Sequence, residues 1–200
     1  MWALSRHFPA RSARGDAPAE PLAWRDAAIQ SFRYHKSLAE RAVAQVTDEA
    51  LHRPLDPHTN SIAVIMKHVG GNLRSRWTDF LTTDGEKPWR NRDDEFVDSF
   101  ATRDELMAAW DAGWTALLDS LQSLSAQDYE RTVVVRGEPH SIPLAIARAL
   151  AHACYHVGQI VQLARHWAGD EWETLTIARG GSAAHNQTVW GAGDYRRRSQ

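Results

Sequence analysis

Apolar residues recur at steps of three and four in four long segments of the chain, and this pattern limits the fold more than any other feature. The segments cover residues 21–47, 61–83, 102–121 and 142–167. A helix with an apolar stripe has to bury that stripe against its neighbours, so four such segments in succession predict an all-α protein, a four-helix bundle. No internal repeat and no low-complexity linker divides the sequence, which favours a single bundle.

Residues with known preferences at helix ends mark the predicted boundaries. Pro21 favours the start of the first helix, which we expect to end near Thr47. Asn60 or Ser61 can accept hydrogen bonds from the first amides of the second helix, and Thr102 can cap the third in the same way. Gly169 follows the fourth segment, and a glycine at this place is typical of a helix C-terminus.

Other parts of the sequence depart from regular helix. Gly70 and Gly71 weaken the second helix by about 1 kcal/mol each relative to alanine, unless a close helix contact or a kink requires them. The stretch "RTVVVRGEPHSIP" at residues 131–143 predicts a short β-like strand and a turn before the last helix, packed outside the bundle. Residues 171–186 are apolar and aromatic enough to form an ordered C-terminal extension that folds back on the bundle.

The two ends of the chain differ in composition from the rest. Residues 1–20 combine arginine with proline, alanine and glycine, which is typical of a disordered leader. Residues 187–200 combine glycine with a basic run, which indicates a flexible tail. The expected organisation is therefore a leader at 1–20, a bundle domain at 21–186 and a tail at 187–200.

Charge and cysteine content narrow the class of protein. Lys and Arg total 23 against 25 Asp and Glu, a formal charge of -2, so we expect no nucleic-acid partner. The single cysteine excludes an intramolecular disulfide and a cysteine-rich zinc module, so a metal site has to use histidines and carboxylates. No stretch resembles a secretory signal or a membrane span, which predicts a cytoplasmic protein without a membrane partner.

Three histidines form the predicted metal site. His152 and His156 are four residues apart and roughly 40° from each other around a helix, so both rings can point at one atom. Cys154 lies roughly 200° from His152 and should face away as a small core residue. The spacing alone favours a pair of exposed or internally hydrogen-bonded rings over a metal site, so a third ligand is needed. His68 is the best candidate, because it follows the apolar run "IAVIM" and can be surrounded by core.

The remaining polar candidates rank lower. Most of the other histidines lie in loops or lack a partner one helical turn away, and we expect them on the solvated surface: His7, His35, His52, His58, His140 and His166. His185 stays open, because its segment can fold over the bundle. The acidic residues Asp79, Asp93, Asp94 and Glu95 are available as bases, although a charge run in a loop is typical of a solvated face. Arg33 or Tyr34 can line a pocket by helical position alone.

The position of His68, the stretch "HACYHVGQI" at residues 152–160 and "ETLTIARGGSAAHN" at 173–186 together resemble the bacterial DinB/YfiT-like metalloenzyme superfamily, in an uncharacterised branch with a C-terminal tail extension. The resemblance covers residues 21–186. It implies a DinB-like four-helix bundle, often a homodimer, in which His68, His152 and His156 bind a divalent metal ion. Gln159 matches a recurrent motif position without an assigned role. His185 stands where an aromatic residue is expected.

The resemblance also suggests a reaction class. Characterised relatives use low-molecular-weight thiols for transfer or isomerisation. We therefore expect a metal-dependent enzyme, a thiol-dependent transferase or hydrolase, whose ion activates a bound thiol or water against a small electrophilic substrate. Nickel or zinc is the first expectation for the metal, and manganese or iron also accept imidazole ligands. The alternative is a non-catalytic metal-binding bundle for stress response or protein interaction, with Trp89 and Trp172 as contact residues, and a metal-free bundle is the third reading.

Overall fold

The computed structural model describes residues 20–190. The predictions for a leader and a tail fall largely on residues 1–19 and 191–200, which lie outside this range. The described chain belongs to two units, one ending at Glu171 and the other containing the residues from Trp172 onward. The proposed domain boundary at residues 186 and 187 stays a prediction.

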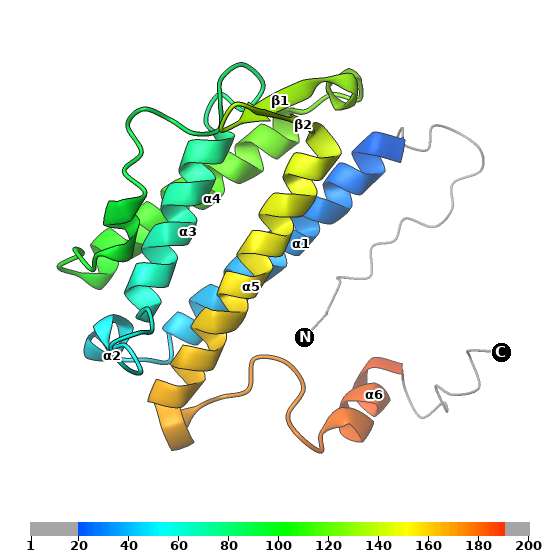
Figure 1. Ribbon diagram of the computed structural model, residues 1–200. Coiled ribbons are helices and arrows are strands. Elements are labelled where there is room, and N and C mark those ends of the chain that lie inside the picture. Colours follow the sequence, from blue (N-terminus) through cyan, green and yellow to red (C-terminus); the bar gives the residue numbers. More distant parts are fainter. Residues whose placement is uncertain (1–19, 191–200) are drawn as a thin grey trace. The chain divides into compact units, whose positions relative to one another are not determined.

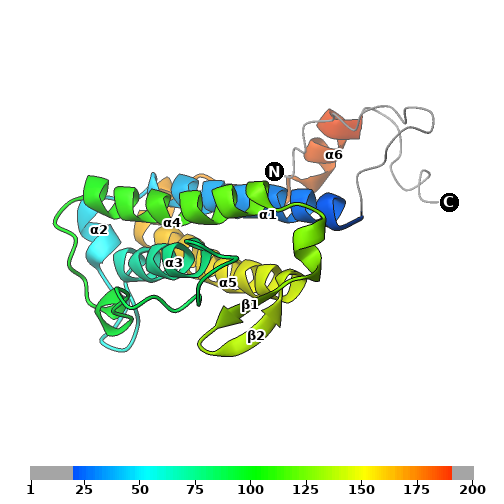
Figure 2. The ribbon, with the colours of Figure 1, turned by 90° about the horizontal axis from the view of Figure 1, so that it is seen from above.

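Four long helices form the first unit and lie side by side in two layers, α4 with α1 and α3 with α5 (Figures 1 and 2). Their bounds are α1 Glu20–Val43, α3 Ile62–Trp77, α4 Arg103–Ser123 and α5 Ile142–Ala168. Helix α3 packs mainly on α4 and α1 mainly on α5, while α3 also contacts α5. The predicted all-α four-helix bundle is confirmed, and α3 and α5 are the neighbours that carry the three histidines.

Shorter elements lie between the four helices and directly after the last of them. They are α2 Asp48–His52, the 3-10 helices Asp93–Phe96, Gln127–Glu130 and Gly169–Glu171, and the strands β1 Thr132–Val135 and β2 Glu138–Ser141. None of the described helices has the length and apolar character needed to cross a membrane.

A β-hairpin precedes α5, as the three valines and the Gly-Glu-Pro sequence predict. Strands β1 and β2 pair antiparallel, with Val133 opposite His140. The turn residues Arg136 and Gly137 have φ values of 56° and 76°, which matches the two-residue turn that fits the twist of a hairpin. The carboxylate of Asp84 accepts hydrogen bonds from both turn amides at 2.8 Å. The hairpin is thereby fixed to the loop after α3 and lies near the start of α5 (Figure 1).

Most of the predicted helix boundaries are confirmed. The hydroxyl of Ser61 accepts from the Val64 amide at 3.3 Å, and Thr102 caps α4 in the same way. Gly169 follows α5 with a φ of 56°. Two helices end earlier than expected: α1 stops at Val43, and α3 stops at Trp77 rather than near residue 83. The chain forms a turn at residues 44–46 after α1, and Thr78 after α3 has an extended backbone, so neither helix continues.

Helices α3 and α4 approach each other closely at two glycines. A Cβ atom added to Gly113 would lie 2.3 Å from the carbonyl oxygen of Gly70, and one added to Gly70 would lie 2.9 Å from the carbonyl oxygen of Ala109. Next to this crossing, the side chains of Trp110 and Trp114 are fully buried. The close contact accounts for the glycine at position 70 inside a helix.

The second unit contains helix α6, Ser182–Trp190. The helix includes residues 182–186 of the predicted extension, whereas residues 172–181 form neither helix nor strand. Folding of this extension onto the bundle stays a prediction.

Candidate metal site and adjoining cavity

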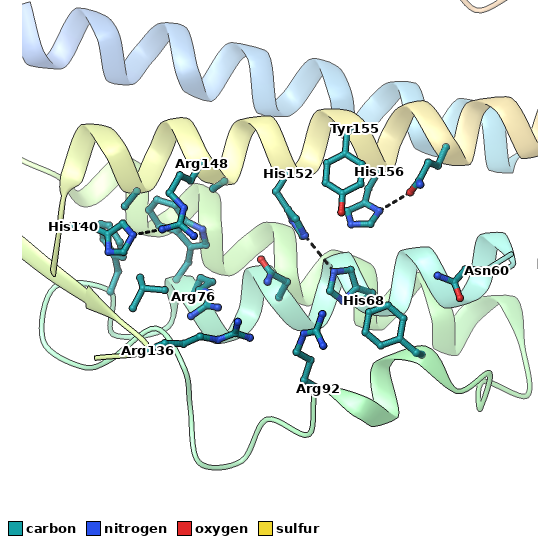
Figure 3. Close-up of a pocket in the computed structure, with 18 residues that line it drawn as sticks. Asn60, His68, Arg76, Arg92, Arg136, His140, Arg148, His152, Tyr155 and His156 are labelled. Atoms are coloured by element: carbon teal, nitrogen blue, oxygen red, sulfur yellow. Dashed lines mark hydrogen bonds between the residues drawn. The ribbon is translucent and has the colours of Figure 1, made fainter. Parts of the chain in front are cut away.

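The three predicted histidines lie together where α3 faces α5. His68 comes from the middle of α3, and His152 and His156 are one turn apart on α5 (Figure 3). One ring nitrogen from each lies within 4.8 Å of the other two, which is a group that could hold a metal ion. The side chains of His68 and His156 are only 5% and 7% exposed, and His152 is half-buried. Helical spacing places His152 and His156 on one face of α5, and the packing of α3 on α5 adds His68.

Hydrogen bonds to the outer nitrogens orient two of these rings. Nδ1 of His68 lies 2.9 Å from a carboxylate oxygen of Glu95, and Nδ1 of His156 lies 2.8 Å from the amide oxygen of Gln159. Since a carboxylate and an amide oxygen only accept, each Nδ1 carries a proton, and in the neutral form of such a ring Nε2 has a free lone pair. Metal-binding histidines normally donate a hydrogen bond from the ring nitrogen that does not bind the metal, as these two rings do. It also gives Gln159, whose role the sequence left open, a role in orienting His156.

The inner nitrogens are suited to a shared ion. Nε2 of His68 lies 3.2 Å from Nε2 of His152. Two nitrogens that bind one tetrahedral zinc ion at about 2.0–2.1 Å lie roughly 3.3 Å apart, so the spacing fits. Nε2 of His156 and Nδ1 of His152 are buried and have no hydrogen-bond partner among the described residues. A buried nitrogen without a partner costs about 1–3 kcal/mol, which a metal bond at Nε2 of His156 would offset.

Burial keeps two of the rings neutral. It lowers the pKa of His152 to about 4, and a positive charge on His156 or His68 would act in the same direction. Burial also lowers the pKa of His156 to about 4, although the hydrogen bond to Gln159 acts in the opposite direction. At neutral pH these imidazoles are therefore unprotonated on one nitrogen, which is the form that binds metal.

The prediction from the sequence was wrong for Glu95. It was expected on a solvated face within the "DDEF" run, but its side chain is only 6% exposed. Arg90 donates to its two oxygens from Nε and Nη2, each at 2.8 Å. Burial alone would raise the pKa of Glu95, but the hydrogen bonds from His68 and Arg90 and the charge of Arg90 lower it below its usual value. Glu95 is thus an ionised carboxylate that holds His68.

Gly71 makes room for this carboxylate. A Cβ atom at position 71 would lie 2.4 Å from Oε1 of Glu95, so any larger residue there would displace the carboxylate. Gly71 is therefore required by the position of Glu95 and not by the close contact between α3 and α4. The other acidic residues of the loops, Asp79, Asp93 and Asp94, are exposed as expected.

A change at Glu95 tests its role in orienting His68. In the variant Glu95→Gln, the neutral amide keeps the size of the side chain but loses the charge that favours the Nδ1-protonated form of His68. We expect metal affinity to fall by about 10- to 100-fold, as is typical for such outer partners. Competition with a chelator of known affinity measures this. The matched control is Glu49→Gln, an exposed position on α2 that does not line the cavity, and an equal loss in the control would contradict the role of Glu95.

The histidines open into a cavity with a volume of about 540 Å³. Its walls come from α3, α5, the hairpin and the 91–96 segment: Asn60, His68, Asn72, Arg76, Trp77, Phe80, Arg92, Phe96, Val135, Arg136, His140, Ala145, Arg148, Ala149, His152, Tyr155, His156 and Gln159. The volume is in the range of small-molecule sites. Tyr155 stands beside His156, with ring centroids 4.0 Å apart (Figure 3).

The residues that line the cavity differ from some of the sequence predictions. His140 was expected on the surface, but it is only 5% exposed, because the hairpin turns it inward to line the cavity. Arg33 and Tyr34 are not among the residues that line it. Cys154 belongs neither to the lining nor to the histidine group, as predicted, but it is half-buried rather than a core residue, and burial raises the pKa of its thiol. No local pattern in the sequence indicates that residues of the hairpin reach this site.

Six histidines remain, and the four that lie in the first unit do not line the cavity. The expectation of a solvated surface is confirmed for two of them, His58 and His166, which are exposed. It is met only in part for His35 and His52, which are half-buried and form hydrogen bonds away from the cavity. The last two of the set are His185, in α6 of the second unit, and His7, outside the described residues.

The model of a family described as a protein of unknown function, DUF1572, matches residues 20–181. The matched region contains helices α1 to α5 and all three histidines of the site. A comparison with curated proteins found no match. The family description names no activity, so a function has to be argued from the site.

Proposed function

The chain belongs to the DUF1572 family of proteins of unknown function, and from this premise we propose that it is a metal-dependent enzyme. In this proposal His68, His152 and His156 hold one divalent ion. The observation that carries it is the meeting of three ring nitrogens within 4.8 Å, two of them on rings whose outer nitrogens already have acceptors. An ordinary pair of surface histidines would not be expected to share that arrangement.

The ligand set supports a catalytic rather than a structural ion. Three neutral imidazoles leave at least one coordination position for a substrate or water, whereas closed structural zinc sites use four protein ligands. Imidazole ligands suit zinc and nickel best, and manganese or iron are weaker candidates. The likeness in fold and ligand spacing supports placing the chain in the DinB/YfiT-like superfamily.

The proposed reaction is a thiol-dependent transfer to a small electrophile or a hydrolysis. The bound ion would supply a thiolate or hydroxide near neutral pH by lowering the pKa of a thiol or water. The chain's own residues orient the groups around it. Glu95 and Gln159 fix the rings of His68 and His156, and Arg90 holds Glu95 in place. No carboxylate is among the residues that line the cavity. Apart from the three histidines that would hold the ion, Tyr155 and His140 are the lining groups that can exchange a proton.

Turnover by the metal-loaded and the metal-stripped protein tests this function. We expect protein purified without a polyhistidine tag and loaded with zinc or nickel to convert at least one member of a panel of small electrophiles, with a low-molecular-weight thiol or water as nucleophile. The chelator-stripped protein is the control and should be inactive. The protein could bind metal and yet show only the background turnover rate in both the metal-loaded and the metal-stripped form. That result would reject catalysis at the site and support the non-catalytic metal-binding bundle.

A further inference from the structure

The wall of the cavity next to the histidines is rich in arginine. Four of the residues that line the cavity are arginines, and none is an aspartate or a glutamate. They come from four different parts of the chain: Arg76 from the end of α3, Arg92 from the loop before α4, Arg136 from the hairpin turn and Arg148 from α5. In Figure 3, Arg76, Arg136 and Arg148 lie on the opposite side of the histidines from Asn60. The cavity therefore has a positive end.

Arg76 is the most buried of these arginines, and its guanidinium group is only partly satisfied. Its side chain is 16% exposed, and Nη2 lies 3.2 Å from Oε2 of Glu86. Nη1 is buried and has no hydrogen-bond partner among the described residues. Burial lowers the pKa of Arg76, while the charge of Glu86 raises it. A buried guanidinium N–H without a partner is costly, and an acceptor that enters the cavity would remove this cost.

One carboxylate oxygen holds three arginines at this end. Oε2 of Glu86 contacts Arg136 Nε at 2.8 Å, Arg76 Nη2 at 3.2 Å and Arg90 Nη1 at 3.5 Å. A single negative charge cannot neutralise three guanidinium groups. Arg90 is also paired with Glu95, but Arg76 and Arg136 have Glu86 in common. The carboxylate of Asp84 adds a second negative charge that acts on Arg76, and Arg148 adds a further positive one. Three guanidinium groups, Arg76, Arg136 and Arg148, therefore face two carboxylates, Glu86 and Asp84, and an excess of positive charge remains at this end of the cavity.

Arg148 is directed by a buried histidine. Nδ1 of His140 lies 2.9 Å from the carbonyl oxygen of Glu138, so this nitrogen carries the proton and donates it. Nε2 of His140 then accepts from Nη1 of Arg148, a contact marked in Figure 3. His140 is only 5% exposed and is held by the hairpin. The hairpin thus supplies Arg136 directly and positions Arg148 through His140.

We propose that Arg76, Arg136 and Arg148 form an anion subsite that binds the carboxylate or phosphate group of a small substrate. The subsite places the rest of that substrate against His68 and His152, so in this respect the inference rests on the proposed function. Guanidinium groups bind both kinds of oxyanion through paired N–H donors. The cavity volume of about 540 Å³ leaves room for both the anionic group and a reacting group.

Binding of simple anions to the metal-free protein tests the subsite separately from the metal. Inorganic phosphate and acetate are titrated into the full chain in the presence of a chelator, and binding is followed by calorimetry. We expect saturable binding of at least one of them, and the tighter of the two identifies the oxyanion class. Arg76→Gln should weaken that binding by about 10-fold or more, because it removes charged hydrogen-bond donors.

Two further variants keep the test decisive. Arg148→Gln removes an exposed side chain and should fold even if Arg76→Gln does not, and it should weaken anion binding by about threefold or more. Arg33→Gln is the charge-matched control, since Arg33 is exposed on α1 and does not line the cavity. Absence of anion binding by the wild type, or equal binding by Arg148→Gln and the wild type, would overturn the subsite.

A second readout separates this inference from the proposed function. Zinc and nickel content should be unchanged in Arg148→Gln, because Arg148 contacts none of the three histidines directly in the described hydrogen-bond network. If the enzyme converts a substrate that carries an acid group, Arg148→Gln should raise the KM for that substrate with little change in kcat. The KM for the neutral ester of the same substrate should not change. Anion binding without any turnover would support the subsite and reject the enzyme. An equal KM shift for acid and ester would reject the subsite.

Discussion

Replacement of His152 by alanine is expected to lower metal affinity by more than about 100-fold, beyond the effect of losing a residue that only orients a ligand. His152 supplies one of three nitrogens of the site, and its Nε2 lies 3.2 Å from that of His68. The two remaining imidazoles come from different helices and cannot hold the ion as firmly. After dialysis, inductively coupled plasma mass spectrometry should find about one ion per chain in the wild type and almost none in His152→Ala.

The matched control for this experiment is His35→Ala. His35 is also half-buried and lies on α1, where its Nδ1 contacts the carbonyl oxygen of Ser31 at 2.7 Å. Because it does not line the cavity, its removal should leave the metal content unchanged. Circular dichroism should show that both variants keep the helical bundle. Equal metal content in His152→Ala and the wild type would contradict the three-histidine site.

Gly113→Ala is expected to be the most destabilising single methyl addition in the bundle. The new Cβ atom would lie 2.3 Å from the carbonyl oxygen and 2.7 Å from the Cα atom of Gly70. These are backbone atoms, so no side-chain rotation relieves the clash and the two helices have to separate. Overpacking costs up to about 3 kcal/mol or more, which exceeds the gain of about 1 kcal/mol in helix propensity. We expect a net loss of about 2 kcal/mol or more in the free energy of unfolding.

Thermal and urea unfolding measure this loss, and Gly158→Ala provides the contrast. Gly158 lies in α5 with no atom within 4 Å of the position of an added Cβ. Alanine should therefore raise the free energy of unfolding by up to about 1 kcal/mol there. At roughly 2–4 °C per kcal/mol, the two variants should move Tm in opposite directions. A Gly113→Ala variant as stable as the wild type would show that α3 and α4 can separate without cost.

The helices were predictable because their signals are local. The apolar stripe of α4 is visible in the sequence and corresponds to fully buried side chains such as Leu106 and Leu121. Thr102 and Gly169 mark helix ends through hydrogen bonds and backbone angles that involve only adjacent turns. His152 and His156 were found for the same reason, because helical spacing alone places them on one face.

The residues that surround the candidate metal site were not predictable in this way. Glu95 looks like part of a solvated acidic run, and its burial depends on Arg90, on His68 from another helix and on the space that Gly71 leaves. His140 looks like a loop residue until the hairpin turns it inward. Nothing in the local sequence indicates that the arginines of the α3 end and the hairpin turn meet at one carboxylate. These contacts depend on long-range packing, which periodicity does not encode.

The placement of the histidines on two helices has a mechanical consequence. Helix α3, with His68, is packed mainly on α4, and α5, with His152 and His156, is packed mainly on α1. An ion shared by the three rings would cross-link these two helix pairs. Its binding energy would be added to the cohesion between them, about 2.7 kcal/mol when free metal is at 100 times its Kd. A chelator would then have an effect beyond loss of activity, because it would also weaken the association of the α3–α4 pair with the α1–α5 pair.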